Sequence, residues 1–287
     1  MKSGTVLLIG RPNVGKSTLV NAIIGQKVAI TSPKPQTTRF SIHALYQEER
    51  GQIIFIDTPG IFNKAKDALA RTINARSKNS LQEDIDLVLY MIDPTRRRDF
   101  EESKVLGLVR KIKAPIILVI NKADIENPTY LPQYKFLEEE YPEVVTISAL
   151  RMKHLKGLLN RIFHYLPEKE ILPETTPRAH PALNMDSHIF LAEIIREKVF
   201  LKTRKELPYT TTVVVDEITE RDTTLTYIRA RILTTHDTYK KMLIGAGGRK
   251  IKEIGGMARK ELETATDKKI YLDLTVETDK HWINTMR

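Results

Sequence analysis

The sequence of 287 residues lacks cysteine, has a single tryptophan and contains no long hydrophobic run. Without cysteine, the chain can form neither a disulfide framework nor a thiolate site for zinc or an iron–sulfur cluster. Its strongly apolar runs, such as residues 116–120, are about five residues long, whereas a membrane-spanning helix needs roughly 20. The apolar stretch at residues 6–9 is too short for a signal peptide. These absences together predict a cytoplasmic protein.

Basic residues outnumber acidic ones, with 46 Lys and Arg against 36 Asp and Glu, for a formal net charge of +10. This excess favours a polyanionic partner, either nucleic acid or an anionic membrane surface. Its distribution is uneven, because residues 240–260 contain seven basic side chains and one acidic side chain. The C-terminal part of the chain is therefore the first candidate for a polyanion-binding surface.

Up to residue 170, short β-branched runs alternate with helical patterns. Strands buried on both faces are expected at residues 5–9, 53–56, 87–92, 116–120 and 144–147. Helices are expected at residues 17–24, 66–80, 101–113, 131–140 and 155–166. This alternation predicts an α/β domain with a mostly parallel sheet and helices on both faces.

A polar stretch interrupted by prolines at residues 171–182 predicts a linker between a first domain, residues 1–170, and a second domain, residues 183–287. Patterns in the second domain predict helices at residues 187–202, 239–243 and 249–264, and strands at 211–217, 225–233 and 269–275. The resulting helix–strand–strand–helix–helix–strand order is an α+β arrangement.

Residues 10–17, Gly-Arg-Pro-Asn-Val-Gly-Lys-Ser, match G-x4-G-K-[ST] between a predicted strand and a predicted helix. Glycines let such a loop fold around phosphates, so that backbone N–H groups and the helix N-terminus face the negative charge. Lys16 would then reach the β- and γ-phosphates, and the Ser17 hydroxyl would ligate Mg²⁺. The alternative is a glycine turn that fits the pattern by chance. The predicted phosphate-binding residues are Gly10, Asn13, Val14, Gly15, Lys16, Ser17, Thr18 and Gly60.

Gly60 belongs to a second motif, Asp57-Thr58-Pro59-Gly60, which follows the apolar run at residues 53–56. Asp57 at the end of a buried strand suits a carboxylate near Mg²⁺, and the Gly60 amide is placed to contact a γ-phosphate. Taken alone, this tetrapeptide is typical of a plain turn. Its position after a phosphate loop favours a nucleotide-sensing switch made of Asp57, Thr58, Pro59, Gly60 and Ile61.

A third motif, Asn121-Lys122-Ala123-Asp124, follows the apolar run at residues 116–120. The Asp124 carboxylate can accept hydrogen bonds from guanine N1–H and the 2-amino group, whereas adenine has neither donor. A helix N-cap is the alternative interpretation. Residues 148–150, after another predicted strand, fit a short loop that supports the base. The predicted base-binding residues are Asn121, Lys122, Asp124, Ser148, Ala149 and Leu150.

These four motifs each follow a predicted strand, where α/β sheets place their ligands. Together they resemble the GTP-binding motifs of the TRAFAC GTPases, and residues 25–32 and 35–39 resemble the switch region of the Era family. The resemblance implies a GTPase that binds GTP, GDP and Mg²⁺. It also implies that Thr38, rather than its neighbour Thr37, closes on Mg²⁺ and the γ-phosphate. The Mg²⁺ ligands are then Ser17, Thr38 and Asp57.

Ile61 occupies the position where many GTPases have a glutamine that orients the attacking water. The chain thus resembles a subclass of GTPases in which a monovalent cation supplies positive charge instead. Asn13 matches the potassium-ligating asparagine of that subclass. Two hypotheses remain open: Asn13 helps to hold K⁺, or it only shapes the phosphate loop. The three arginines at 96–98 are interpreted as a solvated charge run rather than as an arginine finger or an RNA-binding patch.

In the second domain, residues 244–252 place a G-x-x-G sequence between two predicted helices, followed by basic residues. In KH domains this loop holds the backbone of about four single-stranded nucleotides, and nearby cations screen the phosphates. A helix-connecting turn is the alternative. The basic cluster and the order of elements favour a type II KH domain, and the resemblance to the Era family extends through it. The predicted RNA-binding residues are Ile244, Gly245, Ala246, Gly247, Gly248, Arg249, Lys250 and Lys252.

The sequence thus predicts a P-loop GTPase domain followed by a type II KH domain. The resemblance implies that the partner is the 3′ region of small-subunit ribosomal RNA, and that the protein acts in assembly of the small ribosomal subunit. A cytoplasmic monomer is expected, with peripheral association with the inner membrane as a further expectation. The alternative is a membrane-surface regulatory GTPase whose C-terminal domain binds lipid or protein. An ATP-dependent kinase is disfavoured by the guanine-selective motif at residues 121–124.

Overall fold

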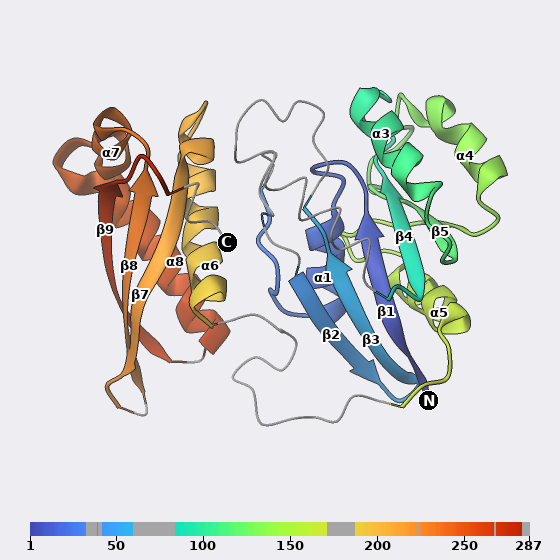
Figure 1. Ribbon diagram of the computed structural model, residues 1–287, viewed down its shortest axis with the longest axis horizontal. Helices are drawn as coiled ribbons and strands as arrows, with labels where there is room; N and C mark the ends of the chain where they lie inside the picture. Colours follow the sequence, from blue (N-terminus) through green and yellow to red (C-terminus); the bar gives the residue numbers. More distant parts are fainter. Residues whose placement is uncertain are drawn as a thin grey trace. The chain divides into compact units, whose positions relative to one another are not determined.

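The computed structural model describes residues 1–32, 39, 42–59, 84–170, 187–222, 224–266 and 268–282. The chain divides into two compact units, Met1–Asn184 and Met185–Arg287, called here the N-terminal and C-terminal units (Figure 1). The predicted helix at residues 66–80 and the predicted linker at 171–182 lie outside the described residues. Among the described helices, none is long and apolar enough to cross a membrane.

The N-terminal unit is built on a six-stranded sheet with the order β2-β3-β1-β4-β5-β6. Its strands are β1 (Lys2–Ile9), β2 (Ile42–Glu48), β3 (Gly51–Asp57), β4 (Leu87–Ile92), β5 (Ile116–Ile120) and β6 (Val144–Thr146). All neighbouring pairs are parallel except β2 and β3, which are antiparallel. The prediction of a mostly parallel sheet is therefore confirmed.

Two strands differ from the sequence-based expectation. Strand β2 was not predicted: it is an edge strand whose residues are partly exposed, so it lacks a continuous apolar run. Strand β6 was predicted to be buried on both faces, and this is wrong, because Val144 and Val145 are half-buried and Thr146 is exposed. Both strands lie at the edges of the sheet, where fewer side chains are covered.

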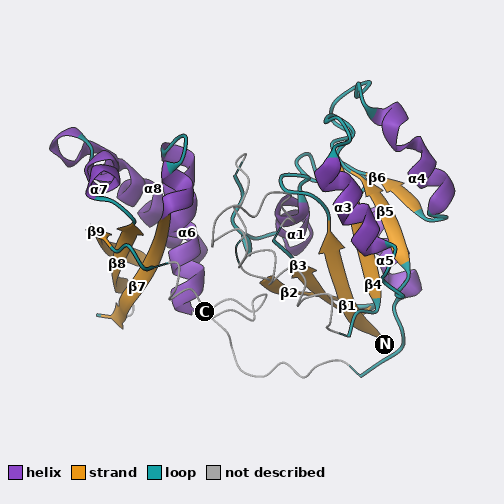
Figure 2. Ribbon diagram, turned by 45° about the horizontal axis from the view of Figure 1, so that its top comes forward, coloured by secondary structure: helices purple, strands orange, loops and turns teal. Residues whose placement is uncertain are grey.

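Helices cover the central strands (Figure 2). They are α1 (Lys16–Ile24), α3 (Phe100–Val109), α4 (Lys135–Glu140) with the preceding 3₁₀ turn η2 (Leu131–Tyr134), and α5 (Leu155–Tyr165). Helices α3 and α4 pack their apolar side chains on one face of the sheet, against residues such as Leu7, Val88 and Tyr90. Residues that point the opposite way, such as Leu8 and Leu89, are also fully buried. Both faces of the sheet are therefore covered, as a parallel sheet requires.

The C-terminal unit is a three-stranded sheet with helices on it (Figure 1). Its elements are α6 (Ser187–Lys202), η3 (Leu207–Thr210), β7 (Thr211–Glu220), β8 (Leu225–Thr234), α7 (Asp237–Ile244), η4 (Ala246–Gly248), α8 (Arg249–Thr266) and β9 (Lys269–Thr278). Strand β8 is central, antiparallel to β7 and parallel to β9. Alternate residues of β8, Ile228, Ala230 and Ile232, are fully buried. This element order confirms the predicted type II KH arrangement.

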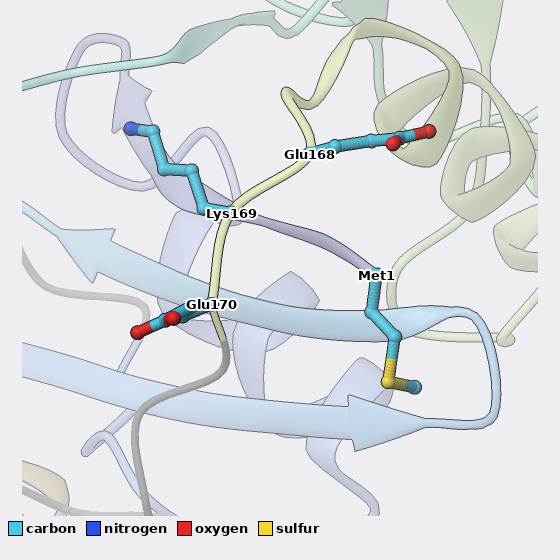
Figure 3. A pocket seen from close by; sticks show the side chains of 4 residues that line it. All are labelled: Met1, Glu168, Lys169 and Glu170. Carbon is cyan, nitrogen blue, oxygen red and sulfur yellow. The ribbon is translucent and has the colours of Figure 1, made fainter.

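The start of β1 is joined to the chain that follows α5. Ser3 N donates to Pro167 O at 3.0 Å, and Lys169 N donates to Met1 O at 3.2 Å. An open pocket of about 590 Å³ lies here, lined by Met1, Glu168, Lys169 and Glu170 (Figure 3). Because β1 begins at this edge, the pocket lies at the amino ends of the parallel strands, whereas the ligand motifs follow their carboxyl ends.

Candidate nucleotide and RNA sites

The predicted nucleotide motifs meet at the carboxyl edge of the N-terminal sheet. Gly10 follows β1, Asp57 ends β3, Asn121 follows β5 and Ser148 follows β6. Asp93, which the sequence analysis did not single out, follows β4 between them. Ligands of open α/β sheets bind at this edge, so the fold brings the separate motifs together in one place.

The phosphate loop has the backbone conformation that its glycines permit. Gly15 has φ of +106°, and a Cβ atom there would clash with Asn121 Nδ2. At Gly10, a Cβ atom would lie 2.6 Å from the carbonyl oxygen of Met91. Helix α1 begins immediately afterwards, at Lys16. The loop therefore leads into a helix N-terminus, the arrangement that binds phosphate through backbone N–H groups.

The Lys16 ammonium lies against the backbone of the same loop. Its Nζ donates to Gly10 O at 3.0 Å and to Arg11 O at 3.3 Å. Burial lowers the pKa of Lys16, and the carboxylates of Asp57 and Glu102 oppose this effect. A buried cation held by two carbonyl oxygens is well placed to bind an incoming phosphate.

Ser17 and Asp57 form the candidate magnesium site. The Ser17 hydroxyl donates to Asp57 Oδ2 at 2.5 Å. Burial raises the pKa of Asp57 to about 6, although the charge of Lys16 and the bond from Ser17 act in the opposite direction. Asp57 Oδ1 is buried and has no hydrogen-bond partner in the described part of the chain. A hydroxyl beside an unsatisfied carboxylate oxygen fits Mg²⁺, a cation that proteins usually bind through one or two carboxylates, with phosphate and water completing its shell.

Asn121 connects three of the motifs through its side-chain amide. Its Nδ2 donates to Val14 O in the phosphate loop at 2.8 Å, and its Oδ1 accepts from Ala149 N at 3.0 Å. The next residue, Lys122, forms an ion pair with Asp93 at 2.5 Å. The base-binding motif thus supports the phosphate loop and the loop that begins at Ser148.

Asp124 has the protonation state that guanine recognition needs. Ser148 Oγ donates a short hydrogen bond to Asp124 Oδ1, and this bond lowers the pKa of Asp124. Arg151 N in turn donates to Ser148 Oγ at 3.1 Å. An ionised, half-buried carboxylate accepts hydrogen bonds and donates none, which matches the two donors on guanine. Of the other predicted base-binding residues, Ala149 is buried and Leu150 is exposed.

Several predicted site residues lie outside the described part of the chain: Thr37, Thr38, Gly60 and Ile61. Of the described ones, Asn13 is exposed with a φ of +62°, and Thr18 is half-buried. Thr58 Oγ1 donates to Leu8 O at 2.8 Å, which ties the start of the predicted switch to β1.

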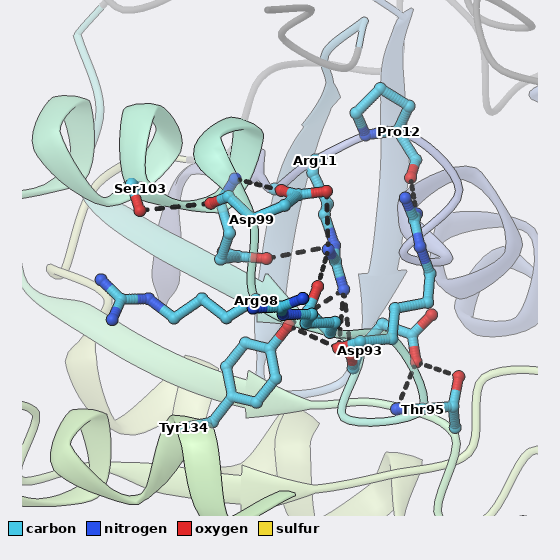
Figure 4. A network of polar contacts seen from close by, with 12 residues as sticks. Arg11, Pro12, Asp93, Thr95, Arg98, Asp99, Ser103 and Tyr134 are labelled. Atoms are coloured by element: carbon cyan, nitrogen blue, oxygen red, sulfur yellow. Dashed lines mark hydrogen bonds and ion pairs between the residues drawn. The ribbon is translucent and has the colours of Figure 1, made fainter. Parts of the chain in front are cut away.

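Arg11, inside the phosphate loop, is a residue whose structural role the sequence analysis missed (Figure 4). Its side chain is fully buried. Its guanidinium donates to the carbonyl oxygens of Asp93 and Arg97 at 3.1 and 3.0 Å and to Tyr134 Oη at 3.0 Å. Its Nε lies 3.2 Å from Glu102 Oε2. These partners are more than 80 positions away, so no local pattern in the sequence could have indicated them.

The interpretation of residues 96–98 as a solvated charge run is wrong for two of the three arginines. Arg96 Nη1 donates to the carbonyl of Pro12 in the phosphate loop at 2.9 Å. The Arg98 guanidinium lies over the ring of Phe136, 4.6 Å from its centroid. Arg97 is exposed. The run is therefore partly structural, because its loop lies beside the phosphate loop.

In the C-terminal unit, the G-x-x-G loop connects α7 to α8 through the 3₁₀ turn η4. Gly245, Gly247 and Gly248 have φ of +73°, +57° and +73°, a conformation that other residues adopt at a cost. A Cβ atom at Gly245 would lie 2.8 Å from Lys250 Cβ. The remaining predicted RNA-binding residues surround this turn, with Ala246, Arg249 and Lys252 exposed and Ile244 and Lys250 half-buried.

A groove of about 350 Å³ begins beside this loop, between α8 and β9. Its lining consists of Ile251, Lys252, Gly255, Gly256, Arg259, Leu272 and Leu274. Apart from Lys252, none of these was predicted as a site residue. Gly255 and Gly256 could have been found from the sequence, because a Gly-Gly pair inside a predicted helix is unusual. Without side chains, these two residues leave room over the groove. An apolar groove beside a G-x-x-G loop is where KH domains accept bases.

Comparison with known proteins agrees with this architecture. A family model described as 50S ribosome-binding GTPase matches residues 5–122, and a KH domain model matches residues 206–283. GTPase Era of Halothermothrix orenii is 42% identical over 284 residues, which cover 98% of this chain and 94% of the relative. The chain belongs to the Era family of GTPases.

A second Era-family relative, GTPase Era of Ectopseudomonas mendocina, is 41% identical and covers 100% of this chain and 95% of its own length. Two solved Era structures, each 36% identical, cover the whole chain with TM-scores of 0.90 and span 96% and 97% of their own chains. One is Era in complex with MgGDPNP and nucleotides 1506–1542 of 16S ribosomal RNA. The other is a variant of Aquifex aeolicus Era bound to GDP·AlF4⁻. As an Era-family member, the chain is a GTP hydrolase.

Proposed function

We propose that this protein is a GTP-controlled switch that binds the 3′ region of small-subunit ribosomal RNA during assembly of the small ribosomal subunit. The observation that carries the proposal is the relative of the same fold that holds MgGDPNP and 16S ribosomal RNA in one complex. Both candidate sites of this chain have the residues for the same two ligands. The N-terminal unit has the phosphate loop and Asp124, and the C-terminal unit has the G-x-x-G loop and groove.

In the proposed site, the backbone N–H groups at the start of α1 and the Lys16 ammonium bind the phosphates. Ser17 and Asp57 would hold Mg²⁺, together with Thr38 from the switch region; this cation neutralises charge on the phosphate oxygens when it is bound. Asp124 selects guanine, and Lys122 lines the same loop, held by Asp93. Chemistry then depends on positioning and on electrostatic stabilisation rather than on a side-chain base.

We further propose that K⁺, held in part by Asn13, supplies positive charge at the phosphates. This charge would compensate for the glutamine that Ile61 replaces. Asn13 is exposed within the phosphate loop, and it occupies the position of the potassium-ligating asparagine in the subclass of GTPases that this chain resembles. An arginine finger in this role is worth about 10³–10⁵ in rate, so the expected effect is large. Replacing K⁺ by Na⁺ should slow turnover, and Asn13→Ala should remove the difference between the two ions. Equal rates in both salts for the unaltered chain would reject the potassium role.

The RNA part of the proposal rests on charge and shape. The loop glycines allow a phosphate backbone to approach closely, and Arg249, Lys250 and Lys252 lie next to them. The adjacent groove of about 350 Å³ has apolar walls from Ile251, Leu272 and Leu274. Such a combination accepts unpaired bases above a clamped backbone.

Crosslinking of the full chain to cellular RNA, with and without a non-hydrolysable GTP analogue, tests this function. The expected result is enrichment of the 3′ end of small-subunit ribosomal RNA, which Gly248→Asp should abolish while leaving GTP binding intact. Enrichment of unrelated RNA, or of none, would reject the rRNA assignment.

We propose a cytoplasmic monomer, with peripheral inner-membrane association measured by flotation with anionic liposomes. Binding to liposomes in place of RNA would favour a membrane-surface GTPase instead.

A further inference from the structure

The phosphate loop contains a buried arginine that no nucleotide motif explains. Arg11 is fully buried, and its guanidinium makes polar contacts to the loop between β4 and α3, to α3 and to η2 (Figure 4). Three are hydrogen bonds to carbonyl oxygens, at 3.0 to 3.4 Å. The others are Tyr134 Oη at 3.0 Å, Glu102 Oε2 at 3.2 Å and Asp99 Oδ2 at 3.5 Å.

The anionic partner is buried as well, so this is an ion pair removed from water. Glu102 is fully buried, and its Oε1 accepts a hydrogen bond from Tyr90 Oη at 2.6 Å. Asp99 Oδ1 caps α3 by accepting from Glu102 N at 3.0 Å. Replacing a buried ion pair by apolar side chains of similar volume is often neutral or stabilising. A buried pair at a ligand loop is therefore better explained by the geometry that it fixes than by a contribution to stability.

The backbone of Arg11 contacts Lys16, the predicted phosphate-binding lysine, directly. Lys16 Nζ donates to the backbone carbonyl of Arg11 itself, at 3.3 Å, and to that of Gly10. The next carbonyls along the loop are held from outside too: Pro12 O by Arg96 and Val14 O by Asn121. Glu102 also contributes a favourable charge to Lys16. The loop backbone is therefore fixed by side chains before any phosphate arrives.

We propose that Arg11 is a positioning residue of the nucleotide site: its buried guanidinium fixes the phosphate loop against the start of α3, and thereby sets the position of the Lys16 ammonium and the loop N–H groups. The proposal rests on the assignment of residues 10–17 as the phosphate loop. Preorganised donors bind a polyphosphate more tightly because they lose less freedom on binding.

A variant series separates this role from general stability. Arg11→Met removes the charge and all hydrogen bonds of the guanidinium but leaves Glu102 buried without its cationic partner, which should lower the midpoint of denaturant unfolding. The double variant Arg11→Met/Glu102→Leu removes the unpaired carboxylate and should recover much of that midpoint. Arg110→Met is the matched control, because Arg110 follows α3 in an exposed ion pair with Glu140. For each folded variant, the dissociation constant of GDP and the unfolding midpoint are measured on the full chain.

The proposal expects GDP binding to weaken about tenfold or more in Arg11→Met, the scale of one lost charge-assisted hydrogen bond. The weakening should persist in the double variant although its stability recovers, and Arg110→Met should bind GDP like the unaltered chain. Recovery of GDP affinity together with stability in the double variant would overturn the proposal. A Lys16→Ala variant distinguishes failure of the Arg11 proposal from failure of the phosphate-loop assignment. If Lys16→Ala keeps full GDP affinity, the assignment of residues 10–17 as the phosphate loop is wrong.

Discussion

Asn121 donates a hydrogen bond from its side-chain amide to the backbone carbonyl of Val14, across 2.8 Å and 107 positions of sequence. The same side chain accepts a hydrogen bond from Ala149 N. A residue of the base-binding motif therefore supports both the phosphate loop and the loop behind the base. We therefore expect Asn121 to act on nucleotide binding mainly by holding these two loops in place.

Asn121→Ala should consequently weaken GDP and GTP alike, by about tenfold to a hundredfold. The reason is that Val14 O and Ala149 N would both lose their partner in a buried place, and each unsatisfied group costs about 1–3 kcal/mol. Titration with a fluorescent guanine nucleotide measures the change. A loss confined to one nucleotide would contradict this supporting role, because neither bond contacts the γ-phosphate.

Asp124→Asn should change the base that is bound, from guanine toward xanthine. The amide of the new side chain can donate to the xanthine 2-oxo group, and it no longer offers two acceptors to guanine. GDP affinity should fall about a hundredfold or more, with a gain for xanthosine diphosphate in a competition titration. The exposed neighbour Glu126 provides the control Glu126→Gln. Unchanged GDP affinity in Asp124→Asn would remove Asp124 from the base site.

Asp57→Asn should stabilise the nucleotide-free protein while impairing its magnesium-dependent nucleotide binding. The pKa of Asp57 is raised from 3.8 to about 6 in the folded state. As the pH rises, the unfolded chain therefore loses this proton at a lower pH than the folded protein does. Stability conferred by the protonated group therefore falls as the pH rises from about 4 to 6. Above this window the asparagine variant should be more stable by at most about 3 kcal/mol.

Urea unfolding of nucleotide-free protein between pH 4 and 8 measures this difference. Asp84→Asn, at an exposed carboxylate, is the control and should follow the unaltered chain across the range. The prediction for Asp57 has opposite signs for stability and for Mg²⁺-dependent binding. A variant that loses both stability and binding would therefore contradict it.

Gly256→Leu should close the groove beside the G-x-x-G loop without harming the fold. Gly256 lies inside α8, lines the groove, and has open space where a Cβ atom would be. Replacing glycine in a helix by leucine raises helix propensity by roughly 0.5–1 kcal/mol, so thermal stability should not fall. Binding of single-stranded RNA should weaken about tenfold or more. Gly157→Leu, at an exposed glycine of α5 with equal space, is the control; equal RNA affinity in both variants would place the bases elsewhere.

The parts of this molecule that sequence reasoning predicted are those encoded in short continuous segments. The phosphate loop and the Asn-Lys-Ala-Asp motif each combine a buried strand with turn residues at a fixed spacing, so both their chemistry and their position at the sheet edge follow locally. The buried strands β1, β4 and β5 were found for the same reason, since their apolar runs are uninterrupted.

The parts that sequence reasoning missed depend on residues far apart in the chain. Arg11 and Arg96 are charged residues in loops and would ordinarily be exposed, and only the folded structure shows their buried or loop-directed contacts. The groove beside the G-x-x-G loop is formed by α8 and β9 together, so the sequence around Leu272 and Leu274 predicts only a strand. Edge strand β2 was missed for another reason: only Ile42 and Ala44 of its residues are buried, so it has no continuous apolar run.

The central claim, that nucleotide state controls RNA binding, is tested most directly by one titration. Filter binding of the full chain to the 3′-terminal segment of small-subunit ribosomal RNA is measured with Mg²⁺ and either a non-hydrolysable GTP analogue or GDP. Coupling between two sites of a switch is typically worth about 5- to 150-fold. The account predicts tighter RNA binding in the GTP-analogue state by a factor in this range. Equal affinity in the two nucleotide states would contradict it.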